Sequence, residues 1–156
     1  MSRVKTAIAI ASMGLAMPIA HAEQPNACGP LILPGKYGPY DYRLAPPEQR
    51  ELVEHAHFTH DVAELRKPMF QYFGPDLHYT LWAFPNHPRA LLTLINLTVK
   101  DKSLQPTSLP YTAECYFERA LRFKSDDVLA RMEVPALAAK NGYPGQVARW
   151  PVGKVA

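Results

Sequence analysis

The sequence predicts an all-α protein, and two observations support this fold class. No stretch of useful length alternates apolar and polar residues in the way that a half-buried strand does. Instead, prolines and capping residues divide residues 48–141 into short segments whose apolar residues recur at helical spacing. An irregular segment rich in proline and tyrosine precedes them at residues 23–47. We therefore expect short helical hairpins behind an irregular lead-in.

Prolines and capping residues set the ends of the expected helices. The first helix begins at Pro46–Pro47, because proline suits the first helical turn. Its apolar stripe is expected to comprise Leu52, Val53 and Ala56. The expected N-caps of the later helices are Thr59, Asp76, Asn86 and either Ser125 or Asp126, while Pro68 and Pro85 end two of them. A further helix is expected from about Thr112 to Phe123, after a polar loop at residues 101–110.

Residues 1–22 have the pattern of a cleavable export signal. Arg3 and Lys5 precede an apolar run, and Ala20-His21-Ala22 forms a small-x-small cleavage site. The apolar run of about 15 residues is short for a membrane anchor, which needs roughly 20. These features predict a periplasmic or secreted protein with no stable membrane span after processing.

Removal of the signal leaves a nearly neutral chain. It takes away two basic residues and no acid, so 15 basic and 14 acidic side chains remain. A nucleic-acid-binding domain needs a concentrated basic face, and none is visible. The pattern therefore predicts no nucleic-acid partner.

The two cysteines, Cys28 and Cys115, both survive processing. Export would place them where disulfides persist, and a bond would close a loop of nearly 90 residues, worth about 4 kcal/mol in the chain-entropy model. Two buried, unpaired thiols are the alternative. We expect the disulfide, which would join the irregular segment to a helix.

A repeat-like pattern lies in residues 111–132. Ala113, Phe117 and Ala120 stand at i, i+4 and i+7 and so share one helical face. Small residues let a neighbouring helix approach closely, and the phenylalanine fills the space between them. A weaker match lies forty residues upstream, where Leu77, Thr80, Leu81 and Pro85 correspond to Phe117, Ala120, Leu121 and Ser125.

The order of a small, a large and a small residue at Ala113, Phe117 and Ala120 resembles the second helix of a tetratricopeptide repeat. Ser125 stands in place of the usual proline. More broadly, the chain resembles the N-terminal part of exported proteobacterial proteins that carry tetratricopeptide repeats. The matching stretches are CGPL, YGPYDYR, VEHAHFT, DLHYTLWAFPNHPRALL and ECYFERALRFKSDDVLARM, which cover most of residues 28–132. This resemblance implies a helical array in the periplasm that binds other proteins, and it implies no catalytic residues.

The end of the chain departs from that pattern. Pro135 lies inside the helix that would begin near Asp127, where proline costs about 3 kcal/mol or kinks the helix. Glycines and prolines then recur through residues 142–156, which we expect to form an irregular tail. Repeat proteins bury each hydrophobic face against a neighbour. The chain is therefore either truncated relative to its relatives or closed by this tail.

Two clusters are candidate sites. Tyr37, Tyr40 and Tyr42 could form a ligand-facing surface, although tyrosines so close together more often pack and order a loop. The second cluster consists of the histidines His55, His57 and His60. Imidazoles bind zinc or copper, but His55 and His57 would point in nearly opposite directions on one helix. Histidines that complement a helix C-terminus are the alternative.

No phosphate-binding loop and no hydrolase or metalloprotease motif is present in the sequence. We therefore expect no catalysis and no cofactor. The sequence favours a periplasmic helical-repeat module that binds a protein or peptide through its hairpin faces and the aromatic loop at residues 35–42. The alternatives are a small exported metal-binding protein that uses the three histidines, and a truncated repeat protein without independent function.

Overall fold

The computed structural model describes residues 28–132 and residue 140, and within these residues the secondary structure is entirely helical. The helices are α1 (Pro47–His57), α2 (His60–Ala63), α3 (Phe73–Ala83), α4 (Pro88–Asp101) and α5 (Ala113–Phe123). Helical backbone resumes at residues 128–132. The expected all-α class is confirmed. The predictions for residues 1–22, Pro135 and residues 142–156 lie outside the described residues.

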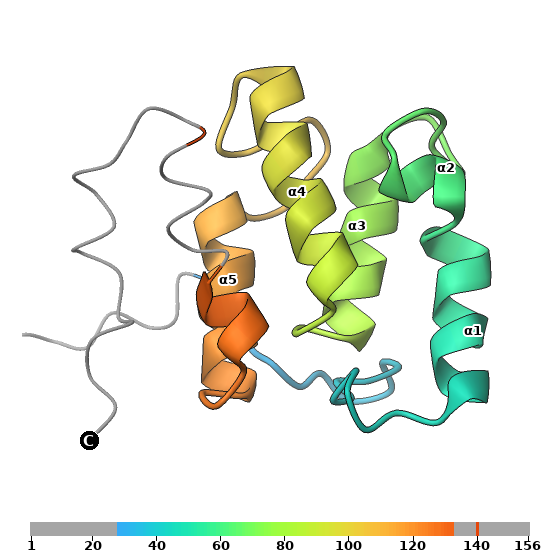
Figure 1. Cartoon of the computed structure of the whole chain (residues 1–156), viewed down its shortest axis with the longest axis vertical. Helices are drawn as coiled ribbons and strands as arrows, with labels where there is room; N and C mark the ends of the chain where they lie inside the picture. The colour runs from blue at the N-terminus through green and yellow to red at the C-terminus, as the bar shows by residue number, and fades with distance from the viewer. Residues whose placement is uncertain (1–27, 133–139, 141–156) are drawn as a thin grey trace, which may run out of the picture.

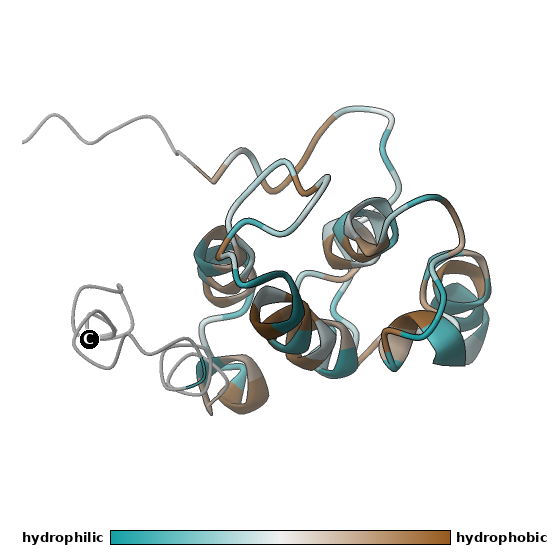
Figure 2. Ribbon diagram, turned by 90° about the horizontal axis from the view of Figure 1, so that it is seen from above, coloured by the Kyte–Doolittle hydropathy of each residue, from teal (hydrophilic) through white to brown (hydrophobic). Residues whose placement is uncertain are grey.

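The long helices α1, α3, α4 and α5 lie side by side and alternate in direction (Figure 1). Helices α4 and α5 each carry one hydrophilic and one hydrophobic side, as the end-on view in Figure 2 shows, whereas α3 is buried over most of its length. The main core is built from these hydrophobic sides, and Leu77, Leu91, Leu94 and Phe117 are all completely buried within it. None of the described helices is both long and apolar enough to cross a bilayer.

Helices α3 and α5 have the same length and begin forty residues apart. Each has 11 residues and is followed by a turn of the same length. In both places the residue directly before the following helix accepts a hydrogen bond from that helix's first turn. The Nδ1 of His87 accepts a hydrogen bond from the amide of Ala90 (3.3 Å), and Oδ1 of Asp127 accepts one from the amide of Ala130 (3.0 Å). The forty-residue correspondence read from the sequence is therefore present in the backbone.

Several expected helix ends were wrong by one to four residues. Helix α3 begins at Phe73, so Asp76 lies inside its first turn and does not cap it. The Asp76 carboxylate instead accepts a hydrogen bond from the amide of Met69 (2.9 Å), which holds the preceding loop. After α3 the cap is His87, one residue later than the expected Asn86. After α5 the cap is Asp127, one or two residues later than the expected Asp126 or Ser125.

The stripe expected on α1 was also wrong in part. Val53 is buried, whereas Leu52 is 61% exposed and Ala56 is exposed.

Helix α2 ends at Ala63, before Leu65, whose backbone takes a left-handed conformation (φ 52°). Thr59 occupies the N-cap position of α2, but its side chain makes no capping hydrogen bond.

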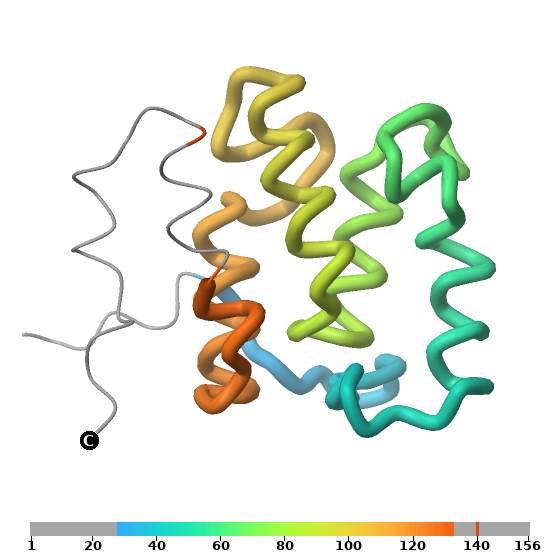
Figure 3. The backbone as a smooth tube through the Cα atoms, in the orientation of Figure 1, coloured from blue at the N-terminus to red at the C-terminus, as the bar shows by residue number. Residues whose placement is uncertain are grey.

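The irregular N-terminal segment runs across one end of the helical layer, from α5 towards α1 (Figure 3). Its first residues are held on α5 by a disulfide between Cys28 and Cys115, with a Cα–Cα distance of 4.9 Å. The buried guanidinium of Arg119 donates to the carbonyl of Pro30 (2.6 Å), and Arg122 donates to the carbonyl of Gly29 (2.8 Å). The expected disulfide is thus confirmed, and it joins this segment to a helix.

The tyrosines of this segment cover a second, smaller core. Tyr37, Tyr40 and Tyr42 pack against the buried side chains of Val53 and Phe84. Gly38 crosses directly over the end of α3 with a positive φ of 90°, and a Cβ at this position would lie 2.7 Å from the carbonyl oxygen of Ala83. The residue at 38 therefore has to be glycine for the loop to approach so closely.

A buried amide ties the segment to both equivalent turns. The Asn86 side chain is 2% exposed, donates to Asp41 (2.8 Å) and Asp127 (2.9 Å), and accepts from the backbone amide of Tyr42 (3.0 Å). Arg43 pairs with Asp41 at 2.8 Å and also reaches Asp127 at 3.5 Å. We call Asp41, Arg43, Asn86 and Asp127 the Asn86 network. It fixes the lead-in segment and the two turns relative to one another.

Candidate functional site

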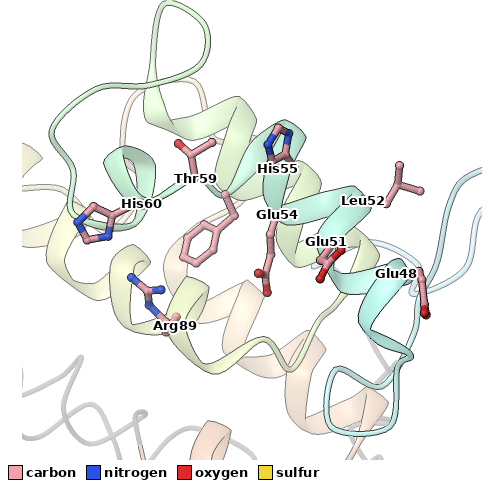
Figure 4. A pocket seen from close by; sticks show the side chains of 9 residues that line it. Glu48, Glu51, Leu52, Glu54, His55, Thr59, His60 and Arg89 are labelled. Atoms are coloured by element: carbon pink, nitrogen blue, oxygen red, sulfur yellow. The ribbon is translucent and has the colours of Figure 1, made fainter.

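An open groove of about 760 Å³ lies between α1, the start of α2 and the start of α4 (Figure 4). This volume falls within the range of ligand-binding clefts, about 300–1,000 Å³. Figure 4 shows His60 and Arg89 on the side opposite the carboxylates that project from α1. The side chains that line the groove are those of Glu48, Glu51, Leu52, Glu54, His55, Phe58, Thr59, His60 and Arg89.

One wall of the groove is the outer face of α1. Glu48, Glu51, Leu52 and His55 stand at i, i+3, i+4 and i+7, so they form a single exposed stripe of the helix. Val53 lies on the opposite, buried face. Burial of Val53 against the tyrosine-rich segment thus sets the rotation of α1 and turns the acidic stripe into the groove.

The floor of the groove is apolar. Phe58 follows the last residue of α1, is 5% exposed and meets the His87 ring edge-on, with 4.8 Å between ring centroids. The guanidinium of Arg89 lies 6.0 Å from the centre of the Phe58 ring and also pairs with Glu64 at 3.4 Å. The positive charge on this wall therefore already has a carboxylate partner.

Glu54 is held at the back of the groove by the half-buried Tyr42 and the buried His87. The hydroxyl of Tyr42 donates to its Oε1 at 2.6 Å, and Nε2 of His87 lies 3.3 Å from the same oxygen. Because Nδ1 of His87 accepts the capping hydrogen bond from Ala90, the neutral ring carries its proton on Nε2, facing Glu54. The Tyr42 ring stacks on the His87 ring at 4.0 Å.

The pKa values in this cluster shift in the directions that the contacts require. Proximity to His87 and to the Tyr42 hydroxyl lowers the pKa of Glu54. Burial lowers the pKa of His87, although Glu54 opposes this shift. Burial and Glu54 together raise the pKa of Tyr42 to about 12. At neutral pH the cluster therefore holds an ionised carboxylate beside a neutral imidazole and a neutral phenol.

The three tyrosines expected as a possible binding surface do not line the groove. Tyr37 meets Tyr40 edge-on at 5.0 Å, while Tyr40 and Tyr42 pack on Phe84 at 6.2 and 5.6 Å. All three are half-buried. Only Tyr42 contributes to the groove, indirectly, by fixing Glu54 from behind.

The three histidines are divided between two sides of α1. His55 and His60 line the groove, whereas the His57 ring stacks on Tyr79 at 4.0 Å. The Nδ1 of His57 lies 3.5 Å from a carboxylate oxygen of Asp76. Within residues 28–132 no group of three or more histidine, cysteine or acidic side chains is arranged to hold a metal ion.

The repeat residues of α5 lie in the core, away from the groove. Ala113, Phe117 and Ala120 are completely buried, and α5 packs against α4. Their spacing therefore reports how the helices pack and says nothing about a ligand.

The groove was missed at the sequence level. The available signal was the spacing of Glu48, Glu51, Leu52 and His55, which places them on one face of α1, but Leu52 was expected in the buried stripe with Val53 and is instead 61% exposed. Its opposite wall could not be foreseen, because Arg89 comes from a helix more than thirty residues further along the chain.

Comparisons with known proteins add no assignment to this geometry. No family model, no curated protein and no solved structure matches the chain. The resemblance to tetratricopeptide-repeat proteins therefore stays a prediction, and the function has to be inferred from the groove itself.

Proposed function

We propose that the chain is an exported helical module that binds a segment of another protein in the groove between α1, α2 and α4. The observation that carries the proposal is the groove itself, which is open, about 760 Å³ in volume, and combines an exposed leucine and a phenylalanine floor with charged walls. Such a mixture of apolar and convergent polar groups is typical of binding clefts.

The rigid surroundings of the groove support the same proposal. Its back wall is fixed by the contacts of Glu54 with Tyr42 and His87, and α1 is tied to α3 through the tyrosine-rich segment. A preorganised site loses less conformational entropy on binding. Export rests on the signal pattern of residues 1–22, and the disulfide between Cys28 and Cys115 is compatible with an oxidising compartment.

Site-specific cross-linking in the native host tests the proposal. A photo-reactive amino acid replaces Leu52 at the groove, and in a matched control it replaces Val99, which is 45% exposed on α4 and does not line the groove. We expect a discrete cross-linked partner from position 52 and none from position 99. The same adducts from both positions, or none from position 52, would contradict the proposal.

The metal-binding alternative is favoured by no observation of equal weight. His55 and His60 do share the groove, but His57 is engaged with Tyr79 on the other side of α1. Metal analysis of protein purified without chelators, compared with a variant lacking His55 and His60, tests it directly. The truncated-repeat alternative predicts a broad, non-cooperative thermal transition, which calorimetry would detect.

A further inference from the structure

We propose that the partner segment is basic and carries an apolar side chain, so that lysine or arginine meets the α1 wall while the apolar group lies beside Leu52 and Phe58. This inference rests on the proposed function and deepens it by naming the chemistry of the partner. It follows from which charges around the groove already have partners and which do not.

The charge balance of the groove is negative. Three carboxylates line it against one guanidinium, which leaves two net negative charges when His55 and His60 are neutral. The guanidinium of Arg89 is paired with Glu64, which does not line the groove. An acidic ligand would therefore have to displace an existing ion pair, whereas a basic ligand would not.

The three carboxylates differ in how many interactions each makes within the protein. Glu54 accepts from Tyr42 and neighbours His87, so its charge has partners within the protein. Glu48 stands in the first turn of α1, where the helix dipole favours an acid. Glu51 lies beyond that turn, is exposed, and has no ion-pair partner among residues 28–132.

The nearest cation on α1 does not face the groove. The guanidinium of Arg50 lies over the Tyr42 ring, 5.5 Å from its centre, on the side of the helix that faces the lead-in segment. Glu51 and Glu48 therefore present their charges to the groove without a neutralising neighbour on the same face. Leu52 stands between these carboxylates and His55 with 61% of its surface exposed. The geometry fits a ligand that offers a positive charge and an apolar group close together.

Short synthetic peptides with identical apolar residues test the inference, using lysine in one, glutamate in a second and serine in a third. Fluorescence anisotropy of the mature, disulfide-bonded chain should show binding of the lysine peptide that weakens as salt is added, because exposed charges are screened. Glu51→Gln should weaken it by about two- to fivefold, the size of one exposed ion pair. Glu114→Gln on α5 is the matched control and should leave it unchanged.

A charge reversal separates a direct contact from a loss of folding. Glu51→Lys should lose affinity for the lysine peptide and gain affinity for the glutamate peptide, which a misfolded variant cannot do. Equal affinity of the three peptides for the wild-type protein, or no binding of the lysine peptide at about millimolar concentration, would overturn the inference. If position 52 still cross-links to a partner in that case, the proposed function stands and only the basic character of the partner is refuted.

Discussion

Replacement of Asn86 by alanine should destabilise the protein more than replacement of any exposed polar residue, because this one amide joins three parts of the chain. The side chain donates to Asp41 and Asp127 and accepts from the amide of Tyr42, and it is 2% exposed. Alanine would leave two carboxylates and one backbone amide short of a partner in a buried position.

The magnitude follows from those three hydrogen bonds. A hydrogen bond to a charged group contributes about 1.5–3 kcal/mol and one between neutral groups about 0.5–1.5 kcal/mol. Arg43 still neutralises part of the charge, since it pairs with Asp41 at 2.8 Å and lies 3.5 Å from Asp127. We therefore expect Asn86→Ala to lower the free energy of unfolding by about 3–5 kcal/mol, a large fraction of the roughly 5–15 kcal/mol typical of a domain.

Urea denaturation at pH 7, followed by far-UV circular dichroism, measures this loss. The matched control is Asn96→Ala on the exposed side of α4, where the side chain accepts one hydrogen bond, from Lys140. It should cost less than about 0.5 kcal/mol. A cost for Asn86→Ala below about 1 kcal/mol, comparable with the control, would refute the idea that the Asn86 network holds the lead-in segment on the helices.

Three further outcomes follow from the contacts described above. Stability should fall as the pH drops below about 6.5, because burial lowers the pKa of His87 and the unfolded chain then binds more protons. It should fall again below about pH 4, because Arg43 holds the pKa of Asp41 well below its usual value; denaturant midpoints from pH 7 to 3 measure both steps. Replacing both cysteines by serine should cost about 3–5 kcal/mol in the same assay, given a sequence separation of 87 residues. Phe117→Ala should cost about 3–5 kcal/mol, because this ring is completely buried, whereas the exposed Leu129→Ala should change stability little.

The sequence indicated most of the helices because each depends on local chemistry. Prolines and small apolar residues at helical spacing placed α1, α4 and α5 to within a few residues. The errors were concentrated at helix N-termini. Asp76 has the side chain of a good cap, but α3 begins three residues earlier, where Gly74 lets the loop at residues 107–108 approach closely.

The one-residue error at the turn after α3 has a tertiary cause. Asn86 and His87 are both able to cap α4 on local grounds. Asn86 is instead drawn to Asp41 and Asp127, which are more than forty residues away in opposite directions along the chain. No local pattern contains that information, and the same holds for the stacking of Tyr42 on His87.

Only one of the two walls of the candidate groove could be predicted from the sequence. Its α1 wall is a periodic feature of one segment, because Glu48, Glu51 and His55 recur at helical spacing. The other wall requires knowledge of where the start of α4 lies relative to α1, since Arg89 reaches the groove over the buried Phe58 ring, 6.0 Å from its centre. The sequence instead drew attention to the tyrosines because they are conspicuous, although their role in the fold is to pack.

The most direct test of the central claim is chemical-shift mapping of a ¹⁵N-labelled chain of residues 23–156 during titration with the lysine-containing peptide. We predict perturbations of the amides around Glu51, Phe58, His60 and Arg89, which come from three different helices or their connections and meet only at the groove. Amides of α5 around Phe117 should not move. Perturbations centred on the tyrosine-rich loop or on α5, with none at Glu51 or Arg89, would contradict the claim that this groove is the binding site.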